Sequence, residues 1–189
     1  MLSPFLTVLI AYLVGSISAA TIVGRVAGGL DMRQEEDGRV SASAVYDKLG
    51  LIAFVVVVLM DASIAALAVL QARFFTDSIY VIMLAGLAAV AGHNWSIFLG
   101  FKGGLGATAI AGVLLALAPV PSVTGMAFAA VMLLLTRRSG TSTILGIIAI
   151  SIAIFYQSNV AVLAIYPIML AIVMLLKKIQ VARYPRPVR

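Results

Sequence analysis

Apolar residues run along this chain in seven long stretches, and polar residues gather in the short segments between them. A helix crosses a membrane core of about 30 Å with roughly 20 residues, and about 17 suffice for a short span. The pattern therefore predicts seven transmembrane helices in one bundle, over residues 4–23, 51–70, 79–99, 105–117, 123–136, 142–155 and 160–176. Pro119 and Pro121 predict a turn between the fourth and fifth helices, and Pro167 a kink in the seventh. Because the fourth to sixth stretches are short, half-spanning helices stay open as an alternative there.

The composition agrees with this pattern. Hydrophobic residues make up 63% of the chain and charged residues 11%, with a mean hydropathy of +1.16, whereas soluble domains carry about 25% charged residues. We therefore expect an all-α polytopic membrane protein that forms a single domain over residues 1–189. The chain has no cysteine, which excludes disulfides, a thiolate nucleophile and a cysteine-based metal site. No metal site is predicted.

The basic residues orient the predicted bundle. With seven spans, every Lys and Arg of the 13 except Arg73 falls on the side that also holds the carboxyl terminus. Basic residues favour cytoplasmic loops, so we expect an external amino terminus and a cytoplasmic carboxyl terminus. The net charge of +6 is then explained by topology and attraction to anionic membrane lipids, and no nucleic acid partner is expected.

The segment 92–106 carries the clearest chemistry. His93 is the only histidine of the chain, and its imidazole can act as an acid, a base or a hydrogen-bond donor near neutral pH. The glycines at 103, 104 and 106 let a backbone approach a phosphate closely, and the helix expected to start at residue 105 adds the positive end of its dipole. Lys102 supplies a positive charge. The alternative is a tight cytoplasmic turn with an ordinary interfacial lysine.

Asp61 lies inside the second apolar stretch. A carboxylate within a membrane span is costly and is a candidate functional residue for that reason. We interpret Asp61 as a possible intramembrane polar site. The alternative is a structural role, in which the group is protonated or bonded to a neighbouring helix.

Taken together, these motifs resemble the bacterial acyl-phosphate:glycerol-3-phosphate acyltransferases, in order and in spacing. The shared residues are Gly15-Ser16-Ile17, Asp31-Met32-Arg33, Leu49-Gly50, Asp61, Gly92-His93, Phe98-Leu99, Phe101-Lys102-Gly103-Gly104 and Gly106. The match covers most of the chain. The resemblance implies an enzyme of phospholipid biosynthesis in the bacterial cell membrane, with its site on the cytoplasmic face, that uses acyl phosphate and glycerol 3-phosphate as substrates and yields lysophosphatidic acid.

The resemblance also implies the site residues. His93 would be catalytic, and substrate and phosphate binding would fall to Gly38, Ser43, Lys102, Gly103, Gly104, Gly106 and Arg137. No cofactor is expected, because an acyl phosphate is already activated and needs only orientation and stabilisation of the developing oxyanion.

The sequence departs from the family pattern inside these motifs. Asp37 replaces a serine, and Ser63 and Leu105 each replace a lysine that would neutralise phosphate. The segments Lys177–Gln180 and Tyr184–Pro187 replace the family's carboxyl-terminal pattern with a basic tail, which we interpret as a lipid-facing anchor. Two alternatives therefore stand beside the acyltransferase: a member that lost the chemistry and binds lipid or a protein partner, and a small transporter.

Overall fold

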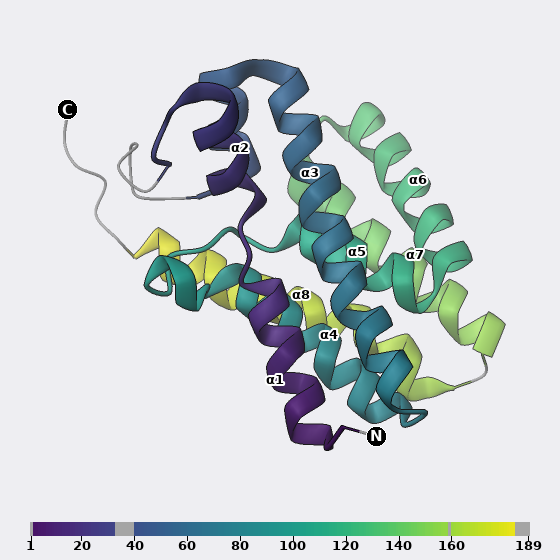
Figure 1. Ribbon diagram of the computed structural model, residues 1–189. Coiled ribbons are helices and arrows are strands. Elements are labelled where there is room, and N and C mark those ends of the chain that lie inside the picture. Colours follow the sequence, from purple (N-terminus) through teal and green to yellow (C-terminus); the bar gives the residue numbers. More distant parts are fainter. Residues whose placement is uncertain (1, 33–39, 159, 184–189) are drawn as a thin grey trace.

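The computed structural model describes residues 2–32, 40–158 and 160–183, and its helices gather into one bundle (Figure 1). The elements are α1 (Pro4–Gly15), α2 (Ala19–Gly28), α3 (Ala42–Phe75), α4 (Ile79–Asn94), the 3₁₀ turn η2 (Ile97–Leu99), α5 (Ala107–Leu117), α6 (Pro119–Thr136), α7 (Ser139–Ser158) and α8 (Ala161–Ala182). The described residues contain no strand. The expectation of an all-α fold is confirmed.

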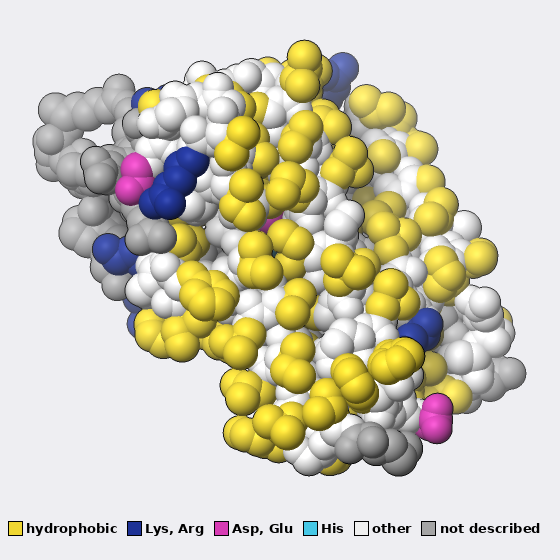
Figure 2. Space-filling model, in the orientation of Figure 1, with side chains coloured by type: hydrophobic (Ala, Val, Ile, Leu, Met, Phe, Trp, Pro, Cys, Tyr) yellow, Lys and Arg dark blue, Asp and Glu magenta, His cyan; other side chains and the backbone are white. Residues whose placement is uncertain are grey.

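Helix length agrees with the membrane interpretation. Among the residues that the structure describes, six segments are long and apolar enough to cross a membrane. Hydrophobic side chains spread over the face drawn in Figure 2. The remaining apolar helix, α5, has 11 residues, which gives a length of about 16 Å at 1.5 Å per residue. Of the three stretches that looked short in the sequence, only the one that forms α5 stays shorter than a full span, and its crossing stays a prediction.

The first apolar stretch forms two helices where one was expected. α1 ends at Gly15, and Ser18 caps α2 by accepting a hydrogen bond from the Thr21 N–H at 3.3 Å. The Ser16 hydroxyl donates to the Tyr12 carbonyl at 2.8 Å. Serine side chains of this kind compete with the helical backbone for hydrogen bonds, so the chain turns here although its hydropathy is continuous. α2 then lies beside the start of α3 at one end of the bundle, opposite the amino terminus (Figure 1).

The boundary between α5 and α6 also differs from the expectation. Pro119 and Pro121 were expected to form a turn, yet α6 begins at Pro119 and only Ala118 separates the two helices. Proline suits the first turn of a helix, where its missing N–H costs no hydrogen bond. α3 begins at Ala42, directly after its N-cap Ser41, and bends at Gly50, whose φ is 78°. Pro167 lies inside α8, which continues to Ala182.

Small residues bring the central helices into contact. A side chain at Gly15 would collide with the Ala89 backbone, and one at Gly92 with the Tyr12 carbonyl, so α1 and α4 pack backbone against backbone. Gly112 faces the Ala62 carbonyl in the same way and joins α5 to α3. Association of helices in lipid depends on such close packing, because lipid removes the usual hydrophobic driving force. These contacts place the ends of α2, α4 and α5 around α3.

Candidate active site

His93 and Asp61 come together inside the bundle. The His93 Nδ1 atom, at the end of α4, lies 3.8 Å from the Asp61 Oδ1 atom on α3, and both side chains are buried. Thr108, in the first turn of α5, donates from its hydroxyl to Asp61 Oδ2 at 3.2 Å. We call His93, Asp61 and Thr108 the His93 cluster. The sequence had predicted the first two of these residues and had missed Thr108, because an isolated threonine in an apolar helix carries no distinctive signal.

Asp61 also reaches a fourth helix. The backbone N–H of Ala19, the first residue of α2, donates to Asp61 Oδ1 at 3.4 Å. The carboxylate therefore faces the amino-terminal ends of both α2 and α5, where helix dipoles favour negative charge. This geometry accommodates both interpretations of Asp61. It accepts hydrogen bonds from two neighbouring helices, and it lies beside His93 Nδ1 at 3.8 Å.

The segment after His93 is fixed on α1. The Tyr12 hydroxyl donates to the Trp95 carbonyl at 2.7 Å, and the Ser96 hydroxyl donates to the Ser16 carbonyl at 2.6 Å. The chain then turns through η2 and two residues with positive φ, Gly100 at 60° and Phe101 at 64°. Ser16, at the break between α1 and α2, thus contributes to the site through its backbone.

We call residues 100–106 the glycine loop. Its Gly103 and Gly104 N–H groups donate to the carbonyls of Asn94 at 3.2 Å and His93 at 3.1 Å. A side chain at Gly103 would collide with the His93 carbonyl, and one at Gly104 would lie 2.6 Å from His93 Nε2. These two glycines therefore act through close packing, since their N–H groups already have acceptors. Nε2 of His93 faces the loop.

The donors left for an anion belong to the start of α5. Its N-cap is Gly106, with φ at 85°, and no side chain caps the helix there. The first N–H groups of a helix have no partner within the helix, and they attract anions. Beneath Gly106 lies the amide of Asn94, which is fully buried and has no hydrogen-bond partner among the described residues. Asn94 had not been singled out from the sequence.

The other predicted substrate residues lie further out. Lys102 is exposed. Ser43 is also exposed, and its hydroxyl lies 3.0 Å from that of Ser41. Arg137 is the exposed C-cap of α6, and within the described part of the chain no hydrogen bond or ion pair joins it to the His93 cluster. Gly38 lies outside the described residues, although nearby Val40 is buried with its carbonyl beside Gly104.

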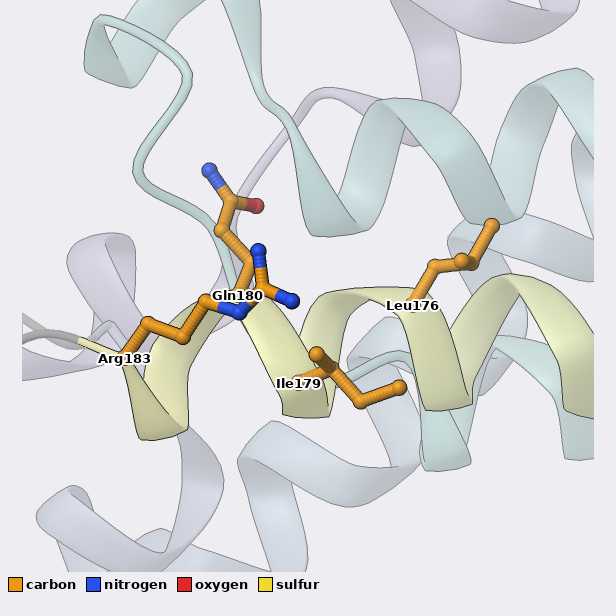
Figure 3. A pocket seen from close by; sticks show the side chains of 4 residues that line it. All are labelled: Leu176, Ile179, Gln180 and Arg183. Atoms are coloured by element: carbon orange, nitrogen blue, oxygen red, sulfur yellow. The ribbon is translucent and has the colours of Figure 1, made fainter.

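The end of α8 corrects one expectation. Lys177 and Gln180 were expected in a lipid-facing anchor, yet Lys177 is only 4% exposed. The Gln180 side chain accepts a hydrogen bond from the Trp95 indole N–H at 2.7 Å. With Leu176, Ile179 and Arg183, Gln180 lines a groove of about 560 Å³ (Figure 3). The sequence could not separate Lys177 from exposed Lys178, because both are basic residues near the end of an apolar helix.

An apolar cavity opens beside the start of α5. It has a volume of about 150 Å³ and is lined by residues of α5, α6 and α7 together with Met174 of α8. Ala107, the first residue of α5, lines it as well. The uncapped end of α5 therefore lies between the His93 cluster and an apolar space.

Comparisons with known proteins agree on one family. The family model described as glycerol-3-phosphate acyltransferase matches residues 5–184. A glycerol-3-phosphate acyltransferase of Bacillus velezensis is 34% identical over 180 residues, which cover 95% of this chain and 89% of that protein. Glycerol-3-phosphate acyltransferase 2 of Moorella thermoacetica is 45% identical over 115 residues, and this alignment covers 61% of the chain and 59% of the relative.

Solved structures give the same result. The crystal structure of PlsY (YgiH), an integral membrane glycerol 3-phosphate acyltransferase, in its glycerol 3-phosphate form matches with a TM-score of 0.79 at 26% identity. The match covers 97% of this chain and 95% of that one. The lysophosphatidic acid form of the same protein also has a TM-score of 0.79, at 25% identity.

Proposed function

The chain belongs to the glycerol-3-phosphate acyltransferase family, and we propose that it transfers an acyl group from an acyl phosphate to glycerol 3-phosphate, giving lysophosphatidic acid. Its relatives carry the name of this activity, and a structural neighbour was solved in glycerol 3-phosphate and lysophosphatidic acid forms. The observation that carries the proposal is the His93 cluster, which faces the glycine loop and the uncapped start of α5.

The reaction is a single displacement at the acyl carbon. The hydroxyl oxygen of glycerol 3-phosphate attacks the carbonyl carbon and forms the new ester bond. The bond between that carbon and the phosphate oxygen breaks, and inorganic phosphate leaves with the electron pair. The proton of the hydroxyl passes to a base and from there to phosphate. Both substrates are anionic, so the site must hold phosphate while it brings the two reacting atoms together.

His93 serves this step at its Nε2 atom. Asp61 lies beside Nδ1, and a carboxylate there favours the tautomer with the proton on Nδ1, which leaves Nε2 as the acceptor. Nε2 faces the glycine loop, where only a glycine fits at position 104. His93 then receives the hydroxyl proton as nucleophilic attack proceeds.

Phosphate binds at the start of α5. The free N–H groups there and the Asn94 amide beneath Gly106 supply donors, and Lys102 supplies charge from the loop. Gly103, Gly104 and Gly106 shape this loop. From the family resemblance, Gly38, Ser43 and Arg137 complete the contacts to substrate when it is bound.

The acyl chain enters the apolar cavity between α5, α6 and α7. Its volume of about 150 Å³ accommodates part of a fatty acyl chain, and the remainder faces membrane lipid. A larger side chain at Ala129, which lines this cavity, should shift the preference toward shorter acyl chains. Competition between acyl phosphates of two lengths measures this shift.

The charge pattern supports a reaction at the cytoplasmic face of a bacterial cell membrane. With α5 counted as the shortest of seven crossings, all the basic residues of the sequence except Arg73 lie on the side of the carboxyl terminus. A reporter fused after Arg189 should be cytoplasmic. A periplasmic reporter would contradict this topology.

The proposal is tested with purified protein in lipid, supplied with acyl phosphate and glycerol 3-phosphate. Lysophosphatidic acid and inorganic phosphate should form in equal amounts, and His93→Ala should lower the rate by about 100-fold or more, as expected for loss of a general base. The matched control is Ser78→Ala at the opposite end of α4, where the hydroxyl makes no capping hydrogen bond. A folded wild-type protein without product would instead favour a member that has lost the chemistry.

A further inference from the structure

Lys177 is a buried cation beside the proposed site. It lies on α8, and only 4% of its surface is exposed. Its Nζ atom lies 3.5 Å from the Phe101 carbonyl and 5.4 Å from the centre of the Trp95 ring. Both neighbours belong to the segment that links His93 to Gly103. Lys178, the next residue, is exposed.

These contacts satisfy the ammonium group poorly. An ammonium has three N–H donors, and the single carbonyl contact lies at the outer limit of hydrogen-bond distance. Within the described ranges, no carboxylate pairs with Lys177. A charge removed from water without a counter-charge is costly, whereas the exposed ammonium of Lys178 avoids this cost. The location of Lys177 therefore calls for an anion.

The glycine loop lacks a basic residue at position 105, where the family pattern has a lysine. Leu105 takes the place of a family lysine, and its side chain is 39% exposed. The loop thus carries Lys102, which is exposed, and no basic residue directly before Gly106. Lys177 approaches the loop at Phe101, from α8. One positive charge is missing at position 105 of the loop, and another is present beside Phe101.

We propose that the Lys177 ammonium binds the phosphate group of a substrate in the His93 site. The identity of that phosphate rests on the proposed function, since glycerol 3-phosphate and acyl phosphate both carry one. The Phe101 carbonyl and the Trp95 ring hold the ammonium in place before the phosphate arrives. Binding of the phosphate then supplies the counter-charge that Lys177 lacks in the empty site.

The test compares Lys177→Met with Lys178→Met. Methionine is unbranched like lysine, keeps most of the length of the side chain and removes the charge. The neighbouring exposed lysine is the matched control. The Michaelis constants for glycerol 3-phosphate and for acyl phosphate are measured separately. Lys177→Met should raise one of them at least about tenfold, as expected for loss of a charge-assisted contact. Lys178→Met should change neither by more than about twofold. The constant that rises identifies the substrate whose phosphate is bound.

A second variant separates phosphate binding from a purely structural tie to the loop. Adding Leu105→Lys to Lys177→Met restores a positive charge at the loop, and it restores no bond to the Phe101 carbonyl. Recovery of the Michaelis constant supports phosphate binding. If Lys177→Met lowers kcat alone and Leu105→Lys recovers nothing, the proposal is overturned. Should methionine prevent folding, Lys177→Gln and Lys177→Arg take its place, with Arg expected to retain binding better than Gln.

A direct measurement of phosphate binding tests the role of Lys177 separately from the acyltransferase activity. Glycerol 3-phosphate and inorganic phosphate are each titrated into the purified proteins, and the shift of the melting temperature is recorded. Stabilisation of the wild type that disappears in Lys177→Met supports the proposal even if no product forms in the activity assay. Turnover by the wild type with unchanged constants and unchanged stabilisation in Lys177→Met contradicts it, while leaving the acyltransferase activity in place.

Discussion

The end of α4 and the α6–α7 pair are built in opposite ways. In the most apolar 18 residues of the span Ile79–Leu99, 50% are buried inside the bundle. In the span Pro119–Thr136 the corresponding share is only 17%. α4 contacts α1 through glycine and backbone, and its end carries His93 and Asn94. α6 presents most of its surface outward and packs chiefly on α7. Close backbone packing restricts the positions of the side chains at the end of α4, whereas α6 and α7 offer a more exposed apolar surface.

The largest effect is expected from Gly103→Ala. The new methyl group would collide with the backbone carbonyl of His93, which cannot move without displacing the imidazole. A displacement of about 1 Å at a catalytic group costs about 100-fold in rate, so activity should fall by at least that factor. The measurement is the initial rate in lipid.

The control for this variant is Gly28→Ala. There the added methyl group meets the flexible ends of the Leu49 and Leu30 side chains, which can move aside. Activity should stay within about twofold of the wild type. Equal losses in the two variants would mean that the glycine loop has no special demand for close packing.

Asp61→Asn should have the second-largest effect on activity. The amide keeps the shape of the side chain. Its oxygen can still accept from the Ala19 N–H and its NH2 group can donate to the Thr108 hydroxyl, but it no longer presents a negative charge to His93 Nδ1. We expect kcat to fall by about 30-fold, as for a misoriented general base, with little change in the Michaelis constants. Full activity in this variant would reduce Asp61 to a structural tie between helices. Thr108→Val, which removes only one of the bonds to Asp61, serves as the milder comparison.

The third comparison sets two glycines against each other in stability. Gly112 on α5 faces the Ala62 backbone, whereas the nearest group to Gly125 on α6 is the side chain of Ile150. Gly112→Ala should lower the free energy of unfolding by about 1–3 kcal/mol through overpacking. Gly125→Ala should cost less, because Ile150 can adjust and alanine gains up to about 1 kcal/mol of helix propensity. Melting temperatures of the purified proteins, recorded in one detergent, test the order.

Much of this contrast could be predicted from the sequence, because hydropathy indicates which segments of the chain prefer lipid to water. The apolar stretches, the special status of Asp61 and His93, and the glycines after Lys102 all followed from residue type and position. The break at Ser16 and the start of α6 at Pro119 did not, since serine and proline act through local backbone hydrogen bonds that an average over 20 residues conceals.

The burial of Lys177 illustrates a further limit. It contacts Phe101, which lies 76 residues away in the sequence, and only the packing of α8 decides that Lys177 faces inward while Lys178 faces outward. A rule that counts basic residues near the ends of spans treats the two alike. Asn94 was missed for a similar reason, because its buried amide matters only in relation to the start of α5.

The smallest effect is expected at the far end of α5. Arg73 donates from its guanidinium to the Leu117 carbonyl at 3.0 Å and so caps the last turn of α5, where a cation favours the helix dipole. Arg73→Gln should lower the free energy of unfolding by about 0.5 kcal/mol and leave turnover within about twofold of the wild type, because the contact is exposed. Its melting temperature should lie between those of the wild type and Gly112→Ala. If Arg73→Gln instead lowered activity as strongly as Asp61→Asn, the position of α5 as a whole would govern the site, and the contrast between a precise end of α4 and a permissive remainder would be wrong.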